Sequence, residues 1–251
     1  MYKPALSCLF ASLAAGAAVP SPLHLFARDG PAAGTVIQSC AEPGVLALTY
    51  DDGPYTNTKA LVDILTEAGA KATFFPTGTL YGCIYDRADS VQYAYDAGMQ
   101  IGSHTWTHPH VGQMGAQQLR DEMTRLEGAL VDIIGVKPTY MRPPYLETGG
   151  SMPQVMTELG YRIVVNDIDS GDWNGYSPQQ SEQQFQMAGA QGNGHIPLMH
   201  ETYDTTVFTL TPWLIDWASQ NNLRLVTVAE CVGDTMEGAY AEGTPANRNS
   251  C

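Results

Sequence analysis

Short apolar runs rich in β-branched and aromatic residues alternate along this chain with stretches of helical spacing. The predicted strands are 45–50, 72–76, 99–103, 139–142, 161–167, 196–200 and 223–228. Predicted helices between them include 58–68, 89–97, 116–134 and 209–219. Because parallel strands need crossover helices, this alternation predicts an α/β fold. About seven strands suit a closed or nearly closed parallel (β/α) barrel better than an open sheet.

The carboxyl ends of the predicted strands carry polar motifs, and in a β/α barrel this is where reactive groups lie. The first strand ends in TYDDGP, which contains Asp51 and Asp52. Successive residues at a strand end point in different directions, so one carboxylate can bind a cation while the other faces a substrate. An ordinary Asp-Gly-Pro turn is the alternative, so this motif is informative only together with the others.

The third predicted strand leads into HTWTH, which places His104 and His108 four residues apart. On one face of a helical turn, this spacing lets both imidazoles reach one metal ion. A lone histidine usually has a structural role. Two histidines at ligand spacing directly after a strand are less often structural and more often metal ligands. With a carboxylate from the first strand they predict a His2Asp site that has open positions for water and substrate.

Three later motifs add groups suited to catalysis. In RPPY, Arg142 can hold a carboxylate, and the prolines stiffen the loop so that the Tyr145 N–H has a fixed direction. In DSGDW, Asp172 lies beside Trp173, whose ring could either line a sugar-binding site or be buried in the core. In LMHE, His200 is suited to general acid catalysis because its ordinary pKa is roughly 6.5.

In this order the segments TYDDG, HTWTH, RPPY, DSGDW and LMHE resemble the five motifs of the NodB-like polysaccharide deacetylases, carbohydrate esterase family 4. The resemblance covers roughly residues 40–232, and the motif sequences are most similar to those of the fungal chitin deacetylases. It implies a distorted parallel (β/α) barrel and one divalent metal ion, usually Zn²⁺ and sometimes Co²⁺. The chain departs from the family at Glu201, where Asp is more frequent; we expect little effect on the chemistry.

The resemblance also implies roles for the residues around the metal. Asp52, His104 and His108 match the metal ligands. Asp51 matches the catalytic base, and Arg142 matches the residue that holds the carboxylate of that base.

Other residues match the acid side and the sugar pocket. His200 matches the catalytic acid, and Asp172 matches the partner of that acid. Tyr145 matches the residue whose N–H holds the oxyanion, and with Trp173 and Leu198 it matches the residues that line the acetyl and sugar pocket.

The function implied is metal-dependent hydrolysis of the N-acetyl groups of chitin or chito-oligosaccharides, which gives a chitosan-like product and acetate. Acetylxylan esterases and peptidoglycan N-acetylglucosamine deacetylases share the motifs and remain alternatives. A serine esterase is disfavoured because the sequence has no G-x-S-x-G motif. A glycoside hydrolase needs carboxylates on opposite sides of the bond, which the adjacent Asp51 and Asp52 do not provide. A sugar-binding protein without activity is a further alternative.

The first residues place Lys3 ahead of an apolar run that ends in small residues, the pattern of a secretory signal peptide. We expect a signal peptide over 1–18, a leader or propeptide over 19–34, and a NodB-like domain over 35–251. The alternative for the apolar run is a buried N-terminal helix. Export to the cell exterior or cell wall is the expected localisation.

The chain is acidic, with 12 Lys and Arg against 26 Asp and Glu, so its formal net charge is −14. Loss of residues 1–18, whose one charged side chain is Lys3, would make it −15. Such a surface repels phosphate backbones and anionic membranes, so we expect neither a nucleic acid nor a membrane as partner. It tolerates a neutral polysaccharide and attracts a partly deacetylated, cationic one. We expect a monomer.

Cys8 would leave with the signal peptide, so that Cys40, Cys83, Cys231 and Cys251 remain in an oxidising compartment. Four cysteines allow three pairings. Cys40 just precedes the first predicted strand and Cys231 just follows the last, so a Cys40–Cys231 bridge would tie the chain ends together. The two remaining cysteines would then form a second disulfide, Cys83–Cys251.

Overall fold

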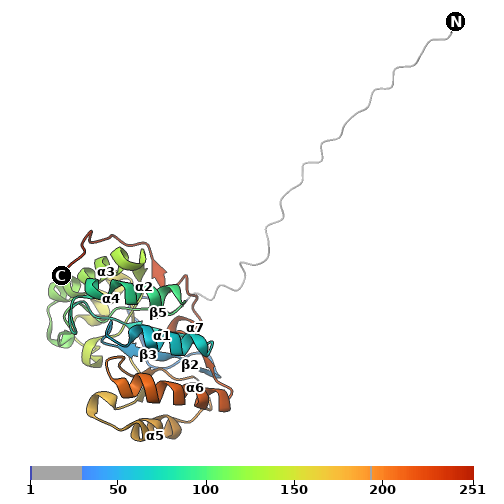
Figure 1. Ribbon diagram of the computed structural model, residues 1–251. Helices are drawn as coiled ribbons and strands as arrows, with labels where there is room; N and C mark the ends of the chain where they lie inside the picture. The colour runs from blue at the N-terminus through green and yellow to red at the C-terminus, as the bar shows by residue number, and fades with distance from the viewer. Residues whose placement is uncertain (2–29, 193) are drawn as a thin grey trace.

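The computed structural model of this protein describes residue 1 and residues 30–192 and 194–251 (Figure 1). The predicted signal peptide, apart from residue 1, and most of the predicted leader fall outside the described residues. The helices are α1 (Thr58–Glu67), α2 (Ala88–Asp96), α3 (Ala116–Ile134), α4 (Met152–Leu159), α5 (Pro178–Ala188), α6 (Thr211–Gln220) and α7 (Val228–Cys231).

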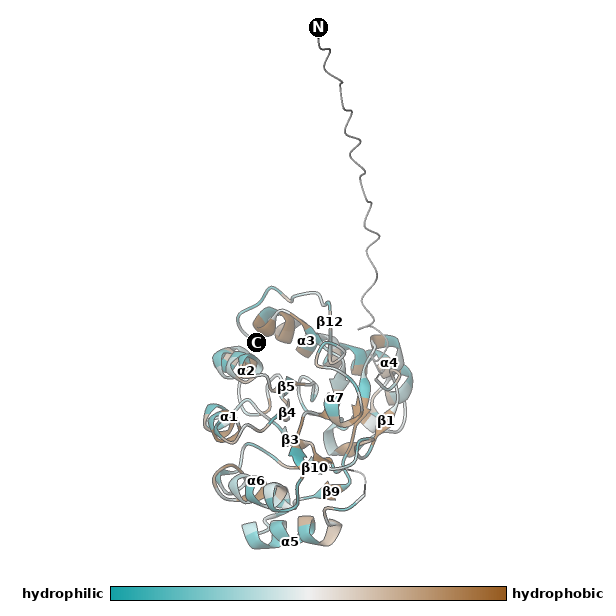
Figure 2. Ribbon diagram, turned by 90° about the vertical axis from the view of Figure 1, so that its right-hand side faces the viewer, coloured by the Kyte–Doolittle hydropathy of each residue, from teal (hydrophilic) through white to brown (hydrophobic). Residues whose placement is uncertain are grey.

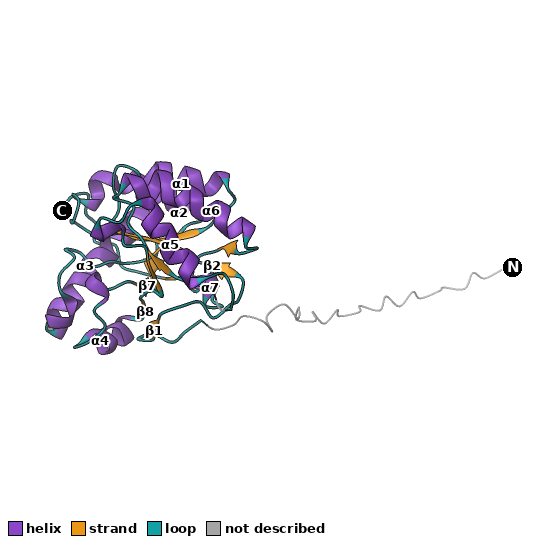
Figure 3. Ribbon diagram, turned by 90° about the horizontal axis from the view of Figure 1, so that it is seen from below, coloured by secondary structure: helices purple, strands orange, loops and turns teal. Residues whose placement is uncertain are grey.

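The strands are short, and most contain two residues. They are β1 (Val36–Ile37), β2 (Val45–Leu46), β3 (Leu48–Asp51), β4 (Ala72–Phe75), β5 (Gln100–Ile101), β6 (Lys137–Pro138), β7 (Tyr140–Met141), β8 (Arg162–Val164), β9 (Ile168–Asp169), β10 (Pro197–Leu198), β11 (Arg224–Leu225) and β12 (Tyr240–Ala241). Helices and strands alternate along the chain as predicted, and the fold is α/β. Helices surround the strands, which lie in the middle of the molecule (Figure 3).

Strand pairing divides the described strands into five small sheets, where the sequence predicted one barrel sheet. The three-stranded sheets have the orders β3-β4-β5 and β1-β8-β7, and both are parallel. The pairs β10-β9 and β11-β2 are also parallel, whereas β12-β6 is antiparallel.

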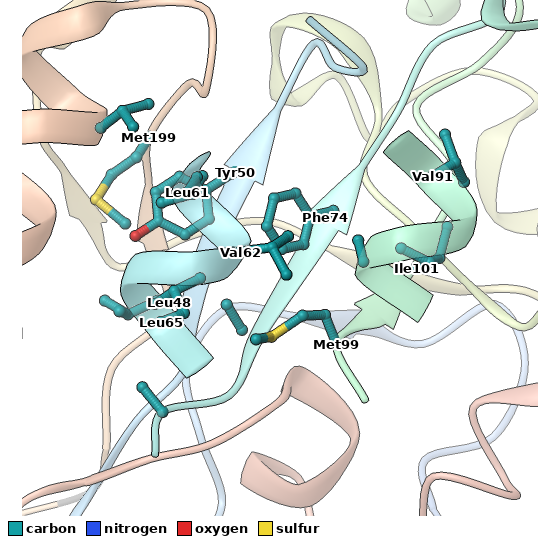
Figure 4. Packing of buried hydrophobic residues seen from close by; sticks show 14 of the residues in the cluster. Leu48, Tyr50, Leu61, Val62, Leu65, Phe74, Val91, Met99, Ile101 and Met199 are labelled. Carbon is teal, nitrogen blue, oxygen red and sulfur yellow. The ribbon is translucent and has the colours of Figure 1, made fainter. Parts of the chain in front are cut away.

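The alternation of side chains along β3 divides the core from the site. Leu48 and Tyr50 pack against Leu61 of α1 and Phe74 of β4 in the largest hydrophobic cluster (Figure 4). Burying a side chain of this size stabilises the fold by about 1.5–3 kcal/mol. Because successive residues of a strand point to opposite faces, Asp51 points away from this cluster.

Helices α1, α2 and α6 line one side of the strands β3, β4 and β5 (Figure 2). All four positions of β3 are buried, as are all four of β4, which is typical of parallel strands covered on both faces. None of the described helices has the length and apolar character needed to cross a membrane.

Two disulfides join distant parts of the chain. Cys40 is bonded to Cys231 across 191 residues, and Cys83 to Cys251 across 168. These are the two pairings expected from the sequence. The Cys40–Cys231 bond joins the segment after β1 to the end of α7, so it links the early and late parts of the fold.

Candidate active site

A cavity of about 440 Å³ lies at the carboxyl ends of the strands. It is lined by residues from all five sequence motifs and by several others: Asp51, Asp52, His104, His108, Pro143, Tyr145, Leu146, Asp169, Trp173, Leu198, His200 and Tyr203. Two further residues are buried behind this lining. Arg142 forms a hydrogen bond with Asp51, and Asp172 forms one with His200. The structure therefore brings together the residues that the sequence singled out.

Asp52, His104 and His108 form a cluster of metal-binding type, since one ligand atom of each lies within 4.8 Å of the others. The Oδ1 atom of Asp52 is 3.5 Å from Nε2 of His104 and 3.5 Å from Nε2 of His108. This buried oxygen makes no hydrogen bond within the described part of the chain. Burial raises the pKa of Asp52 to about 6, a cost that a bound cation would offset.

The two histidines lie in a loop, so the predicted helical turn is wrong. Thr105 and His108 have φ angles of 69° and 58°, which a right-handed helix cannot contain. The ring centroids of His104 and His108 are nevertheless 4.9 Å apart. Left-handed residues thus bring the two rings together where the prediction relied on helical spacing.

His104 is held in the form that a metal ligand requires. Its Nδ1 lies 2.6 Å from the carbonyl oxygen of Arg142, which can only accept, so Nδ1 carries the hydrogen and the lone pair of Nε2 faces Asp52. Burial lowers the pKa of His104 to about 3. Burial and the neighbouring His104 lower the pKa of His108 to about 4. Both imidazoles are therefore neutral near pH 7.

Asp51 forms a buried ion pair with Arg142. The guanidinium Nη1 donates to Oδ1 of Asp51 at 2.9 Å and to the hydroxyl of Thr49 at 2.6 Å, while Nη2 donates to the carbonyl of Val165 at 3.0 Å. Burial raises the pKa of Asp51 above its ordinary value, and the charge of Arg142 opposes that rise. The second carboxylate oxygen, Oδ2, faces His104 at 3.9 Å and has no hydrogen-bond partner among the described residues.

His200 and Asp172 form a second pair on the other side of the cavity. Nδ1 of His200 donates to Oδ1 of Asp172 at 2.7 Å, which leaves Nε2 available for the cavity. Oδ2 of Asp172 accepts from the backbone N–H of His200 and from the hydroxyl of Thr206, both at 2.8 Å. Burial lowers the pKa of His200, but the bond to Asp172 and nearby carboxylates outweigh it and raise this pKa to about 9. The imidazole is therefore protonated near pH 7.

Aromatic side chains form the walls of the cavity. The ring of Tyr145 stacks on His110 with centroids 3.9 Å apart and meets His108 edge-on at 4.8 Å. Trp173 is 54% exposed, and its indole N–H donates to Asp169 at 3.1 Å. Leu198 of β10 adds an apolar lining residue. An exposed tryptophan at the cavity rules out the alternative of a buried core residue.

Sequence reasoning missed several residues that the structure places at the site. Thr49 has a usable signal, since it lies two residues before Asp51 on the same face of β3. Asp169 also has a signal, since it begins the DSGDW motif at the end of β9. His110 and Tyr203 have no such signal, because their contacts depend on loop conformations. Glu201 is buried and accepts a hydrogen bond from Thr58, and burial raises its pKa to about 8.

Comparisons with known proteins identify the family of this chain. Residues 38–164 match the family described as "Polysaccharide deacetylase". A chitin deacetylase of Pestalotiopsis sp is 39% identical over 240 residues, covering 95% of this chain and 80% of the relative. One from Arthroderma benhamiae is 38% identical, but this chain spans only 57% of its length.

A solved structure shows the same fold. The chitin deacetylase from the fungal pathogen Colletotrichum lindemuthianum superimposes with a TM-score of 0.81 at 35% identity, covering 86% of this chain and 99% of that one. These similarities confirm the resemblance drawn from the five motifs. The chain belongs to the polysaccharide deacetylase family.

Proposed function

We propose that this protein hydrolyses the N-acetyl groups of N-acetylglucosamine units in chitin or chito-oligosaccharides, giving acetate and a chitosan-like product. One observation carries the proposal: the cluster of Asp52, His104 and His108 lies in the same cavity as Asp51 and the His200–Asp172 pair. The relatives named chitin deacetylases support this choice of substrate.

Asp52, His104 and His108 are the residues that would hold the metal ion. Two neutral imidazoles and a carboxylate are typical of a catalytic zinc site with an open position, so Zn²⁺ is our first assignment and Co²⁺ the second. Such an ion, when bound, polarises the acetamide carbonyl and lowers the pKa of a coordinated water.

Asp51 is the proposed base and His200 the proposed acid. Asp51 lines the cavity, and its Oδ2, which has no hydrogen-bond partner among the described residues, is available to take a proton from the attacking water. Arg142 keeps the carboxylate ionised. His200 is protonated near pH 7 and can donate to the departing amine through Nε2. Asp172 holds the His200 ring in the orientation that this transfer needs.

The residues along the wall of the cavity are assigned to the oxyanion and the sugar. Tyr145 lies inside the short turn Pro144–Leu146 with a φ of 56°, and we assign its backbone N–H to the developing oxyanion. Trp173 and Leu198 would line the acetyl group and the sugar ring, because an aromatic face and an aliphatic side chain suit a pyranose.

A distorted (β/α) barrel accounts for the small sheets. An isolated parallel bridge joins Asp51 of β3 to His200 beside β10, and another joins Ser103 beside β5 to Met141 of β7. β8 is followed directly by β9, with residues 165–167 between them. Parallel pairing runs from β9 through β10, β3, β4, β5 and β7 to β8, and the chain itself connects β8 to β9, which supports a barrel.

Export of a monomer made of one NodB-like domain over residues 35–251, after loss of residues 1–18, completes the proposal. Two disulfides support an oxidising compartment. The fungal relatives match this chain over most of its length, which supports a single domain.

Acetate release from defined chito-oligosaccharides tests the proposed function. The protein, loaded with Zn²⁺ or Co²⁺, is incubated in parallel with chito-oligosaccharides, acetylated xylan and peptidoglycan. We expect acetate from the chito-oligosaccharides without new reducing ends, which separates a deacetylase from a glycoside hydrolase and from a binding protein. Acetate from xylan or peptidoglycan alone would contradict the choice of chitin.

A further inference from the structure

Glu147 directly follows the turn Pro144–Leu146 and binds the loop of residues 104–112, which carries the two histidines of the metal cluster and is called the metal-binding loop below. One carboxylate oxygen of Glu147 accepts from Nδ1 of His110 at 2.9 Å, and the other accepts from the backbone N–H of Gly112 at 2.7 Å. The Gly112 N–H and the neighbouring His110 lower the pKa of Glu147, so this carboxylate is charged near pH 7. Glu147 therefore ties the end of the turn to two points of the loop.

The ring of Tyr145, in the middle of the turn, packs on the same loop. It stacks on the ring of His110, with centroids 3.9 Å apart and an angle of 13° between the planes. It also meets the ring of His108 edge-on, with centroids 4.8 Å apart. Although the Tyr145 side chain is 57% exposed, two imidazoles of one loop thus define where its ring lies.

The backbone of Tyr145 needs such support. Its φ of 56° lies in the left-handed region, which is unfavourable for a residue with a Cβ and persists only where the surroundings hold it. Two backbone hydrogen bonds close the turn, from Leu146 to the carbonyl of Pro143 at 3.0 Å and from Glu147 to the carbonyl of Pro144 at 3.2 Å. Neither of these bonds uses the N–H of Tyr145, so the direction of this N–H depends on the conformation of the turn.

The start of the segment is tied to the metal-binding loop as well. The carbonyl oxygen of Arg142 accepts from Nδ1 of His104 at 2.6 Å. The segment from Arg142 to Glu147 is thus fixed to this loop at its start, at the Tyr145 ring and at its end. An oxyanion that is held both by a metal ion and by an N–H needs these two groups at a constant separation. Ties to the loop that carries the histidine ligands provide it.

We propose that His110 and Glu147 are positioning residues for the oxyanion, which set the direction of the Tyr145 backbone N–H relative to the metal cluster. This inference rests on the proposed function, which assigns that N–H to the oxyanion. The described lining of the cavity contains neither residue, so both act through Tyr145. A donor that is preorganised where charge develops stabilises the transition state more than the bound substrate. Loss of either residue should therefore lower kcat and leave KM nearly unchanged.

Measuring kcat and KM separately tests this inference. Both constants are determined for acetate release from a defined chito-oligosaccharide, beside metal content, in wild type, His110→Ala, His110→Phe and Glu147→Ala. We expect kcat to fall about 10- to 100-fold in His110→Ala, with KM and metal content close to those of the wild type. His110→Phe retains a flat ring that can stack on Tyr145, and it should recover most of this loss. Glu147→Ala should also lower kcat alone.

Two further variants sharpen the comparison. His195→Ala is the matched control, because Nδ1 of His195 also donates to a carboxylate, that of Asp167 at 2.7 Å. That pair lies before β10, at the end of the strand away from His200, so its loss should leave kcat and KM close to wild-type values. The double variant His110→Ala with Glu147→Ala should lose about as much kcat as the worse single variant, because both residues act through one turn.

The outcomes separate this inference from the proposed function. If the wild type releases no acetate, the proposed function fails, and this inference fails with it. If it does, a wild-type kcat in His110→Ala and Glu147→Ala overturns the inference and leaves the proposed function standing. A raised KM with unchanged kcat would show that His110 binds the sugar, and lost metal that it supports the ligands; either result also overturns the inference. If His110→Ala does not fold, Glu147→Ala compared with the wild type decides in the same way.

Discussion

Four residues at the cavity have a left-handed backbone although none is glycine. Asp52, His108, Tyr145 and Leu146, which all line the cavity, have φ angles of 72°, 58°, 56° and 56°. Each such residue costs about 1–2 kcal/mol because its Cβ crowds the carbonyl oxygen. The chain thereby turns sharply after its strands and directs these side chains into one cavity. Sequence patterns do not reveal such turns, which explains why a helical turn was wrongly expected at His104 and His108.

The pKa of His200 predicts a pH dependence. Its pKa of about 9 means that the acid form persists at neutral pH and is lost as pH rises through that value, so acetate release by the wild type should fall there. Asp172→Asn removes the carboxylate that raises this pKa, and the lowering effect of burial then dominates. We expect the alkaline limb of kcat to move down by about 1 pH unit or more.

Thr206→Val is the control for this pH experiment. It removes one hydrogen bond to Asp172 but retains the charge beside His200, so its alkaline limb should stay close to that of the wild type. An Asp172→Asn profile with an unmoved limb would show that His200 is not the acid.

At the scale of elements, prediction succeeded where packing acts on long periodic stretches. Helix α3 occupies Ala116–Ile134 as predicted, because residues such as Leu119 and Met123 repeat at helical spacing along one buried face. Helix α5 is harder to recognise, since only Ser181 and Phe185 are buried and its start depends on the capping residue Ser177. Strands came out shorter than predicted, because apolar composition does not show where a strand loses its pairing partner.

Gly78 is expected to hold the loop that carries His104 and His108 in position. Its backbone N–H donates to the carbonyl of Thr105 at 3.3 Å, and an added Cβ would lie 2.2 Å from the Trp106 ring. That ring is buried and carries the Arg125 guanidinium 4.3 Å from its centre, so it has little room to move. Gly78→Ala should displace the loop and lower metal affinity by about 10- to 100-fold.

Metal titration of the stripped protein measures this effect directly. Gly149→Ala is the matched control, because a Cβ at Gly149 meets no atom within 4 Å. Unchanged metal affinity in folded Gly78→Ala would show that the loop holds its shape without this contact.

At the scale of the whole molecule, the order of the five motifs was the strongest signal, since each follows a different strand and parallel strands place their carboxyl ends together. The contacts that complete the site join residues far apart in sequence, such as Arg142 to Thr49, and depend on how the strands are paired. The division of the described strands into five small sheets could not be predicted, because two-residue strands carry little pattern.

The Cys40–Cys231 disulfide should contribute strongly to global stability. It closes a loop of 191 residues, for which chain entropy predicts about 4–5 kcal/mol. We expect the variant with Cys40→Ser and Cys231→Ser to lose about this much free energy of unfolding in guanidinium titrations. A loss below about 1 kcal/mol would show that the bond constrains the unfolded chain far less than this entropy estimate requires.

The different roles of Asp51 and Asp52 are the central claim, and metal content measured beside acetate release tests it most directly. Asp52→Asn should lower both, because Asp52 contacts His104 and His108 in the metal cluster. Asp51→Asn should keep its metal, while its rate falls by about 10²- to 10⁴-fold through loss of the base. Loss of metal in Asp51→Asn with retention in Asp52→Asn would reverse the assignment, and full activity in both would contradict the deacetylase mechanism.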